Sequence, residues 1–145
     1  MFRRARALAV ALVAACVLAG VAAAGGNGSG KFDLLGPNGN ALCDGSGVLS
    51  GAPGDFGFAV INAPSDGTVS ATVSIKGQQP DTDYVIRLVQ GDADCFTVDA
   101  MVTTNGQGNA TVHLSEPSVS TTALIAVDTG ALFGTPSFVT ETYNH

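Results

Sequence analysis

The chain has 145 residues, of which only 12% are charged, and a formal net charge of −6. An acidic chain repels phosphate backbones and anionic lipid headgroups, so we expect it to bind no nucleic acid. The two histidines and three cysteines leave few side chains for a soft metal site.

Residues 1–24 have the three parts of a secretory signal peptide. Three arginines and no acid precede an unbroken apolar run over residues 7–18, and a small-x-small pattern ends at Ala24. This order is typical of a leader that signal peptidase removes. We therefore predict cleavage after Ala24 and a secreted, extracellular location.

Two other interpretations of the leader stay open. Residues 7–24 are just long enough for a membrane anchor, but no stop-transfer charge follows them. Residues 13–16 resemble a bacterial lipobox, which would make Cys16 the lipidated residue of a surface lipoprotein, although the apolar run continues past it. The membrane would then be a partner only through an uncleaved or lipidated leader. The Ala- and Arg-rich composition indicates a bacterial source.

Cleavage changes the charge balance, because Arg3, Arg4 and Arg6 leave with the leader. The chain that remains has twelve acidic side chains and three basic ones, Lys31, Lys76 and Arg87. Its formal charge is therefore −9.

Cys43 and Cys95 are the cysteines outside the leader. Two cysteines in an oxidising compartment are expected to pair. The bridge would close a loop of roughly 50 residues and contribute about 4 kcal/mol in the chain-entropy model. Two free buried thiols are the alternative, whereas zinc lacks the remaining ligands.

The leader is followed by a Gly-rich stretch, residues 25–30, which we interpret as a flexible linker. Residues 31–145 follow as one domain, long enough to bury a core of its own. Residues 36–54 are rich in glycine and predict a long loop with one short strand near Val48. The predicted disulfide would tie this loop down at Cys43.

Strand patterns dominate the domain. Residues 68–76 alternate apolar and polar side chains, a period of two that a helix would not produce. Similar patterns predict strands at residues 32–35, 56–62, 84–88, 96–102, 110–114, 123–127 and 138–143. Turn residues separate them at 64–67, 79–81 and 105–109, and the last turn predicts a hairpin. The fold class is all-β, an antiparallel two-sheet sandwich.

Residues 73–88 resemble the fibronectin type III and related immunoglobulin-like domains. In that family a Leu-x-Pro-x-Thr-x-Tyr pattern marks a corner, and Pro80, Thr82 and Tyr84 match it. Gln78 stands where the leucine belongs, and the chain has no tryptophan. The resemblance implies an immunoglobulin-like sandwich with a tyrosine corner, and a binding or spacer module.

The histidines give little support for catalysis. His113 lies on the polar face of its predicted strand, His145 is the last residue, and no Gly-x-Ser-x-Gly elbow is present. We expect no enzyme and no catalytic residue. A secreted enzyme of unfamiliar type would require His113 to meet a nucleophile in a cleft.

Acidic residues on predicted loops raise the alternative of calcium binding. They are Asp81, Asp83, Asp92, Asp94 and Asp99. Calcium takes six to eight oxygen ligands, and the EF-hand spacing is absent. We expect a solvated turn at residues 92–94, and neither a metal nor a cofactor.

The sequence therefore predicts a non-enzymatic structural or interaction module at the cell envelope or in the medium. Its partner would be an unidentified envelope or extracellular protein, to which an exposed sheet edge could offer a strand pairing. A small-ligand or calcium-binding secreted protein is the alternative.

Overall fold

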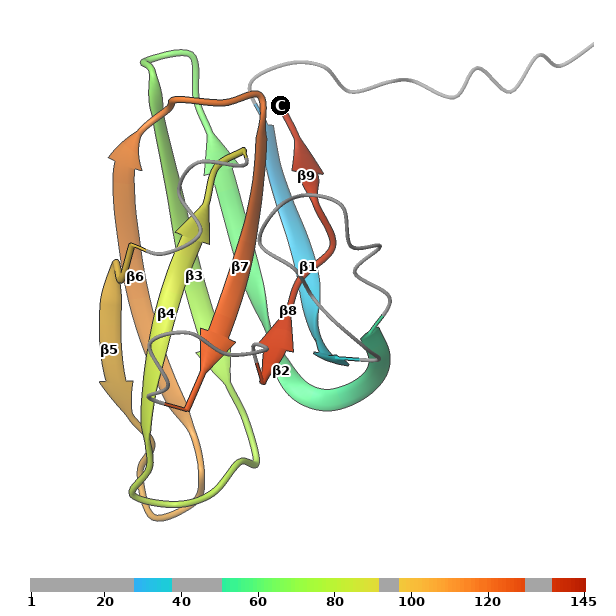
Figure 1. The fold of residues 1–145 in the computed structure, drawn as a ribbon, viewed down its shortest axis with the longest axis vertical. Helices are drawn as coiled ribbons and strands as arrows, with labels where there is room; N and C mark the ends of the chain where they lie inside the picture. Colours follow the sequence, from blue (N-terminus) through green and yellow to red (C-terminus); the bar gives the residue numbers. More distant parts are fainter. Residues whose placement is uncertain (1–27, 38–50, 92–96, 130–136) are drawn as a thin grey trace, which may run out of the picture.

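The computed structural model describes residues 28–37, 51–91, 97–129 and 137–145. All regular structure in these residues is antiparallel β, which confirms the predicted all-β class (Figure 1). The strands are β1 (Gly28–Pro37), β2 (Gly51–Ala63), β3 (Thr68–Ile75), β4 (Asp83–Val89), β5 (Ala100–Thr103), β6 (Ala110–Pro117), β7 (Thr122–Asp128), β8 (Phe138–Val139) and β9 (Tyr143–Asn144). Ala24, Cys16, Cys43, Cys95 and Val48 lie outside the described residues.

The strands form one sheet that nearly closes on itself. Its order is β5-β4-β7-β8-β1-β2-β3-β6, with β9 paired to β7. One half is β5-β4-β7-β8 and the other is β1-β2-β3-β6, and within the described residues a single register pair of β1 with β8, Leu35 and Val139, joins them. Strands β5 and β6 are consequently the two edges of the sheet.

The predicted alternation is confirmed most clearly in β3. Every second side chain is buried, from Val69 to Ile75, and those between are half-buried. The inward side chains of both halves meet in one core, to which Leu34, Ile61, Ile86 and Ile125 each contribute a fully buried side chain. Burying an aliphatic side chain of this size contributes about 2–3 kcal/mol, so this shared core holds the two halves together.

Strand β4 is buried on both of its faces. Tyr84, Ile86 and Leu88 point into the core as the alternation predicts, but Val85 and Val89 on the opposite face are buried as well. On that side a second apolar cluster consists of Val89, Ala126 and Val139, with Leu124 packed against it. The outer face of this half is therefore not a solvated surface.

The segment predicted as one strand over 96–102 forms a shorter strand in its described part. Ala100 is the register partner of Ile86, yet the Asp99 N–H also donates to the Ile86 carbonyl, at 3.0 Å. Two residues thus oppose one, as in a β-bulge. The Asp99 carboxylate then accepts the Leu88 N–H at 2.6 Å and replaces the next ladder bond.

Three other boundaries differ from the prediction. Residues 28–30, assigned to the flexible linker, are paired in β1 opposite residues 61–63. Residues 51–54, assigned to the loop, belong to β2. The single strand predicted over 138–143 is two short strands, because the Thr140 hydroxyl accepts the Ile125 N–H at 3.0 Å in place of a backbone carbonyl.

The predicted hairpin at residues 105–109 is wrong in its pairing, although its turn is present. The Gly108 N–H donates to the Asn105 carbonyl at 2.8 Å. The flanking strands, however, pair elsewhere, β5 with β4 and β6 with β3. The turn packs instead against the end of β3, where the Gln78 N–H donates to the Gly108 carbonyl at 3.0 Å. The segment that contains this turn therefore connects β5, at one edge of the sheet, to β6, at the other edge.

Candidate functional site

A groove lies between the two edges of the sheet. It has a volume of about 540 Å³ and is lined by residues 90, 97–99, 113–117 and 119. One wall is β6, and the opposite wall is the segment that leads into β5. We call this groove the seam.

Among the described residues, no strand pairs with the edge of β6 that faces away from β3. Lys76 N–H donates to the Phe56 carbonyl, so even-numbered residues of β3 direct their backbone groups toward β2. The odd-numbered residues of β3 therefore bond to β6, and their register partners are its even-numbered residues. The N–H and C=O groups of Thr111, His113 and Ser115 consequently point to the free edge.

Exposed apolar side chains gather at the edges of the sheet. Within the described residues, the large hydrophobic side chains that are exposed are Val98, Met101 and Val119, at 38%, 64% and 71%. Met101 lies on β5, Val98 just before it, and Val119 just after β6. Val98 and Val119 line the seam, whereas Met101 is not among its lining residues.

Gln90 closes one end of the seam. This side chain lies just after β4, is 2% exposed, and reaches the segment that follows β6. Its Nε2 donates to the Pro117 carbonyl at 3.0 Å, and its Oε1 accepts the Val119 N–H at 3.0 Å. The amide therefore links the two halves of the sheet across their open side.

Replacing Gln90 with leucine is expected to lower the free energy of unfolding by about 2 kcal/mol, because a buried N–H and a buried carbonyl lose their partners. Chemical denaturation measures the change. Gln79→Leu, at an exposed position, is the control and should stay within about 0.5 kcal/mol. Equal effects of the two substitutions would contradict this role for Gln90.

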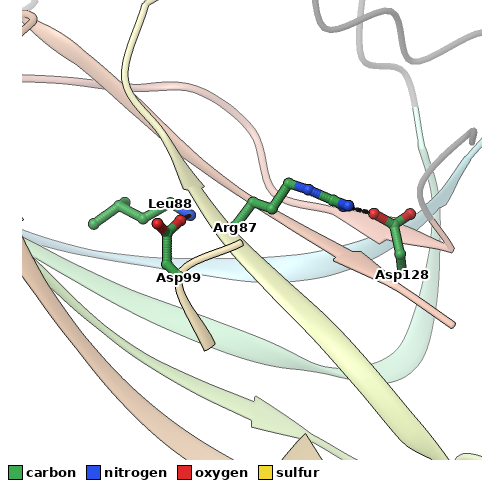
Figure 2. A network of polar contacts seen from close by, with 4 residues as sticks. All are labelled: Arg87, Leu88, Asp99 and Asp128. Atoms are coloured by element: carbon green, nitrogen blue, oxygen red, sulfur yellow. Dashed lines mark hydrogen bonds and ion pairs between the residues drawn. The ribbon is translucent and has the colours of Figure 1, made fainter. Parts of the chain in front are cut away.

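A buried ion pair lies on the outer face of the half formed by β5-β4-β7-β8. Figure 2 shows Arg87 on β4 reaching Asp128 at the end of β7, diagonally across the two strands. Arg87 and Asp128 are 5% and 3% exposed. The Arg87 Nε has no hydrogen-bond partner among the described residues. A pair this well covered offers no opening to a ligand, so we assign it a structural role.

Phe58 on β2 lies between the two lysines of the described residues. Lys31 Nζ is 4.2 Å and Lys76 Nζ 5.2 Å from the centre of its ring, on the outer face of β1-β2-β3. Asp33 and Asp55 line the same hollow. The free ammonium groups are thus on a different surface from the seam.

His113 is exposed, as its place on a polar strand face predicts. It also lines the seam. Its Nδ1 lies 3.1 Å from the hydroxyl of Thr72, the residue opposite it in the register. In the described part of the chain no carboxylate orients this imidazole. His145 follows β9, which pairs with β7 in the other half of the sheet, and its ring stacks on Tyr143. The contact between His113 and Thr72 is an ordinary cross-strand pair.

The acids considered for calcium are not brought together where the structure describes them. Asp83 accepts the Thr103 hydroxyl at 2.5 Å, Asp99 holds the Leu88 N–H, and Asp81 adopts a positive φ of 50°. Asp92 and Asp94 lie outside the described residues. Within the described ranges no three metal-binding side chains form a group.

Sequence reasoning did not single out Gln90, Arg87 or Asp128. The one available signal was the nearly continuous apolar run of residues 84–89 around Arg87, which is typical of a strand buried on both faces. A comparison with protein families, with curated proteins and with solved structures finds no match for this chain. The described residues contain no helix of the length and apolar character needed to cross a bilayer.

Proposed function

We propose that this protein is an exported, non-catalytic interaction module that binds an envelope or extracellular protein partner at the seam. The observation that carries the proposal is the unpaired edge of β6 within a groove flanked by exposed Val98 and Val119. Proteins usually protect such edges with lysine, proline or a bulge. The eight register pairs of β3 with β6 contain no bulge, and no lysine lies on β6; its one proline, Pro117, is its last residue, so the part of the edge from Thr111 to Ser115 has none of these protections.

We further propose that the fold is an immunoglobulin-like two-sheet sandwich. The orders β2-β3-β6 and β5-β4-β7-β8 correspond to strands A-B-E and C′-C-F-G of that architecture. The Pro80-Thr82-Tyr84 pattern does not add to this support, because a tyrosine corner lies at the start of strand F, here β7, whereas this pattern leads into β4, which contains Tyr84. The strand order therefore supports the proposal better than the motif does.

The export part of the proposal rests on the sequence. A leader cleaved after Ala24 would deliver the domain to an oxidising compartment, in which Cys43 and Cys95 would pair.

Val119→Lys tests the seam, since it places a charge on its most exposed apolar side chain. In a pull-down from envelope extract, we expect the wild-type chain to retain a partner and this variant to lose at least about 90% of it, a loss of about 1.4 kcal/mol in binding. Thr142→Lys adds the same charge at an exposed residue between β8 and β9, and should bind like wild type. Equal retention by both variants would contradict the proposal.

A further inference from the structure

We propose that Asn105 is a site of spontaneous covalent modification, at which the side-chain amide leaves as ammonia and a cyclic imide forms with the nitrogen of Gly106. The site lies in the turn between β5 and β6, outside the residues that line the seam. The inference is independent of the proposed function, because the reaction needs only the folded chain and water.

Gly106 supplies an unhindered nucleophile. A side chain on the residue after an asparagine shields the backbone nitrogen that has to attack, and glycine has no side chain. Gly106 is exposed, and its N–H has no hydrogen-bond acceptor among the described residues. The nitrogen can therefore react without first breaking a contact within the fold.

The turn polarises the side-chain carbonyl of Asn105. Its Oδ1 accepts the Gln107 N–H at 2.9 Å and the Asn109 N–H at 3.0 Å. Both partners are donors, which identifies the amide atom that faces them as the oxygen. Paired N–H donors at about 2.7–3.1 Å are the arrangement that stabilises a developing oxyanion in acyl transfer. The turn thus makes Cγ of Asn105 a better electrophile.

The amide nitrogen of Asn105 is accessible as a leaving group. The residue is exposed, and its side-chain contacts within the described ranges are the two that its Oδ1 accepts. No hydrogen bond from Nδ2 to these residues has to break before ammonia departs. Solvent can therefore reach Nδ2 and deliver the proton that it needs.

The reaction balances with water as its co-reactant. The Gly106 nitrogen gives its proton to a solvent base and forms a bond to Cγ of Asn105, whose oxygen takes the negative charge. The bond from Cγ to Nδ2 then breaks, and Nδ2 takes a proton from water and leaves as ammonia. Water opens the imide at Cγ to give aspartate, or at the main-chain carbonyl of residue 105 to give isoaspartate.

Either product changes the connection between β5 and β6. Aspartate adds a negative charge to an already acidic chain. Isoaspartate lengthens the main chain by one carbon inside a closed turn, in which the Gly108 N–H donates to the Asn105 carbonyl and the Asn105 N–H donates to the Asn109 carbonyl. The isoaspartate product therefore loosens the link between the two edges of the sheet.

The test incubates the purified full chain at neutral pH and follows each asparagine by peptide mass spectrometry. Asn105 should convert to aspartate and isoaspartate, while Asn62 and Asn109, which precede alanine, should stay unmodified over the same period. Gly106→Ala is the matched variant, because a Cβ at this position meets nothing within 4 Å and the φ is not left-handed. It should slow the conversion at least about tenfold, or about 1.4 kcal/mol in the barrier.

A comparison with the unfolded chain decides whether the turn contributes. Asn105 should lose ammonia at least as fast in the native chain as in guanidinium chloride at the same pH and temperature, because only the fold holds the two N–H groups against Oδ1. Faster conversion in the denaturant would mean that the turn protects the side chain, and would overturn the inference. A smaller slowing by Gly106→Ala would overturn it as well, because access to the nitrogen of residue 106 would then not control the rate.

Discussion

Asp128→Ala is expected to lower the free energy of unfolding by about 3–5 kcal/mol, the largest effect of any single polar substitution in the described residues. The change removes the partner of Arg87, which is 5% exposed and has no other side-chain partner there. A guanidinium left uncompensated at this depth keeps its desolvation cost without an opposing charge. Urea denaturation followed by circular dichroism measures the loss.

The double variant Arg87→Met with Asp128→Leu separates the charge from the packing. Both replacements have side chains of suitable size for the apolar cluster of Val89, Ala126 and Val139 on the same face. Removing both charges together is expected to restore stability to within about 1 kcal/mol of wild type, or to exceed it. If the double variant is as unstable as Asp128→Ala, the loss comes from packing and the account of the ion pair is wrong.

The sequence predicted most strands well because one face of each packs on the core. Alternation in β3, in β6 and in the first half of β7 follows directly from this half-burial. The same rule misjudged the outer face of β4, where Val85, Arg87 and Val89 are buried. Periodicity reports which residues share a face, whereas the second layer of contacts depends on tertiary packing that a single sequence does not encode locally.

The seam was beyond sequence reasoning for a related reason. Turn chemistry at residues 105–109 correctly located the place where the chain turns. It says nothing about which strands the flanking segments join, and β5 and β6 join different ones. Gln90 is likewise unremarkable in sequence, because its role depends on the distant Pro117 and Val119. An exposed edge was predicted as a general property of sheets, but its identity as β6 required the topology.

Gly57→Ala is expected to cost about 3 kcal/mol or more of folding stability. Gly57 lies inside β2 opposite Ile75, with a φ of +118° that side-chain-bearing residues rarely adopt. A Cβ built there would lie well inside 3.0 Å of the Ser74 carbonyl, a separation that real Cβ atoms essentially never show. Because the obstacle is backbone in the adjacent strand β3, relief requires the β2–β3 ladder to move.

Gly67→Ala separates the collision from the backbone conformation. Gly67 in the turn before β3 also has a positive φ, +81°, but a Cβ built there meets nothing within 4 Å. Its substitution should cost only the left-handed conformation, about 1 kcal/mol. Thermal and urea denaturation of the two variants give the difference, which we attribute to the contact with β3. Similar losses at both positions would mean that β2 shifts freely at Gly57, and that the strand is less tightly held against β3 than its register implies.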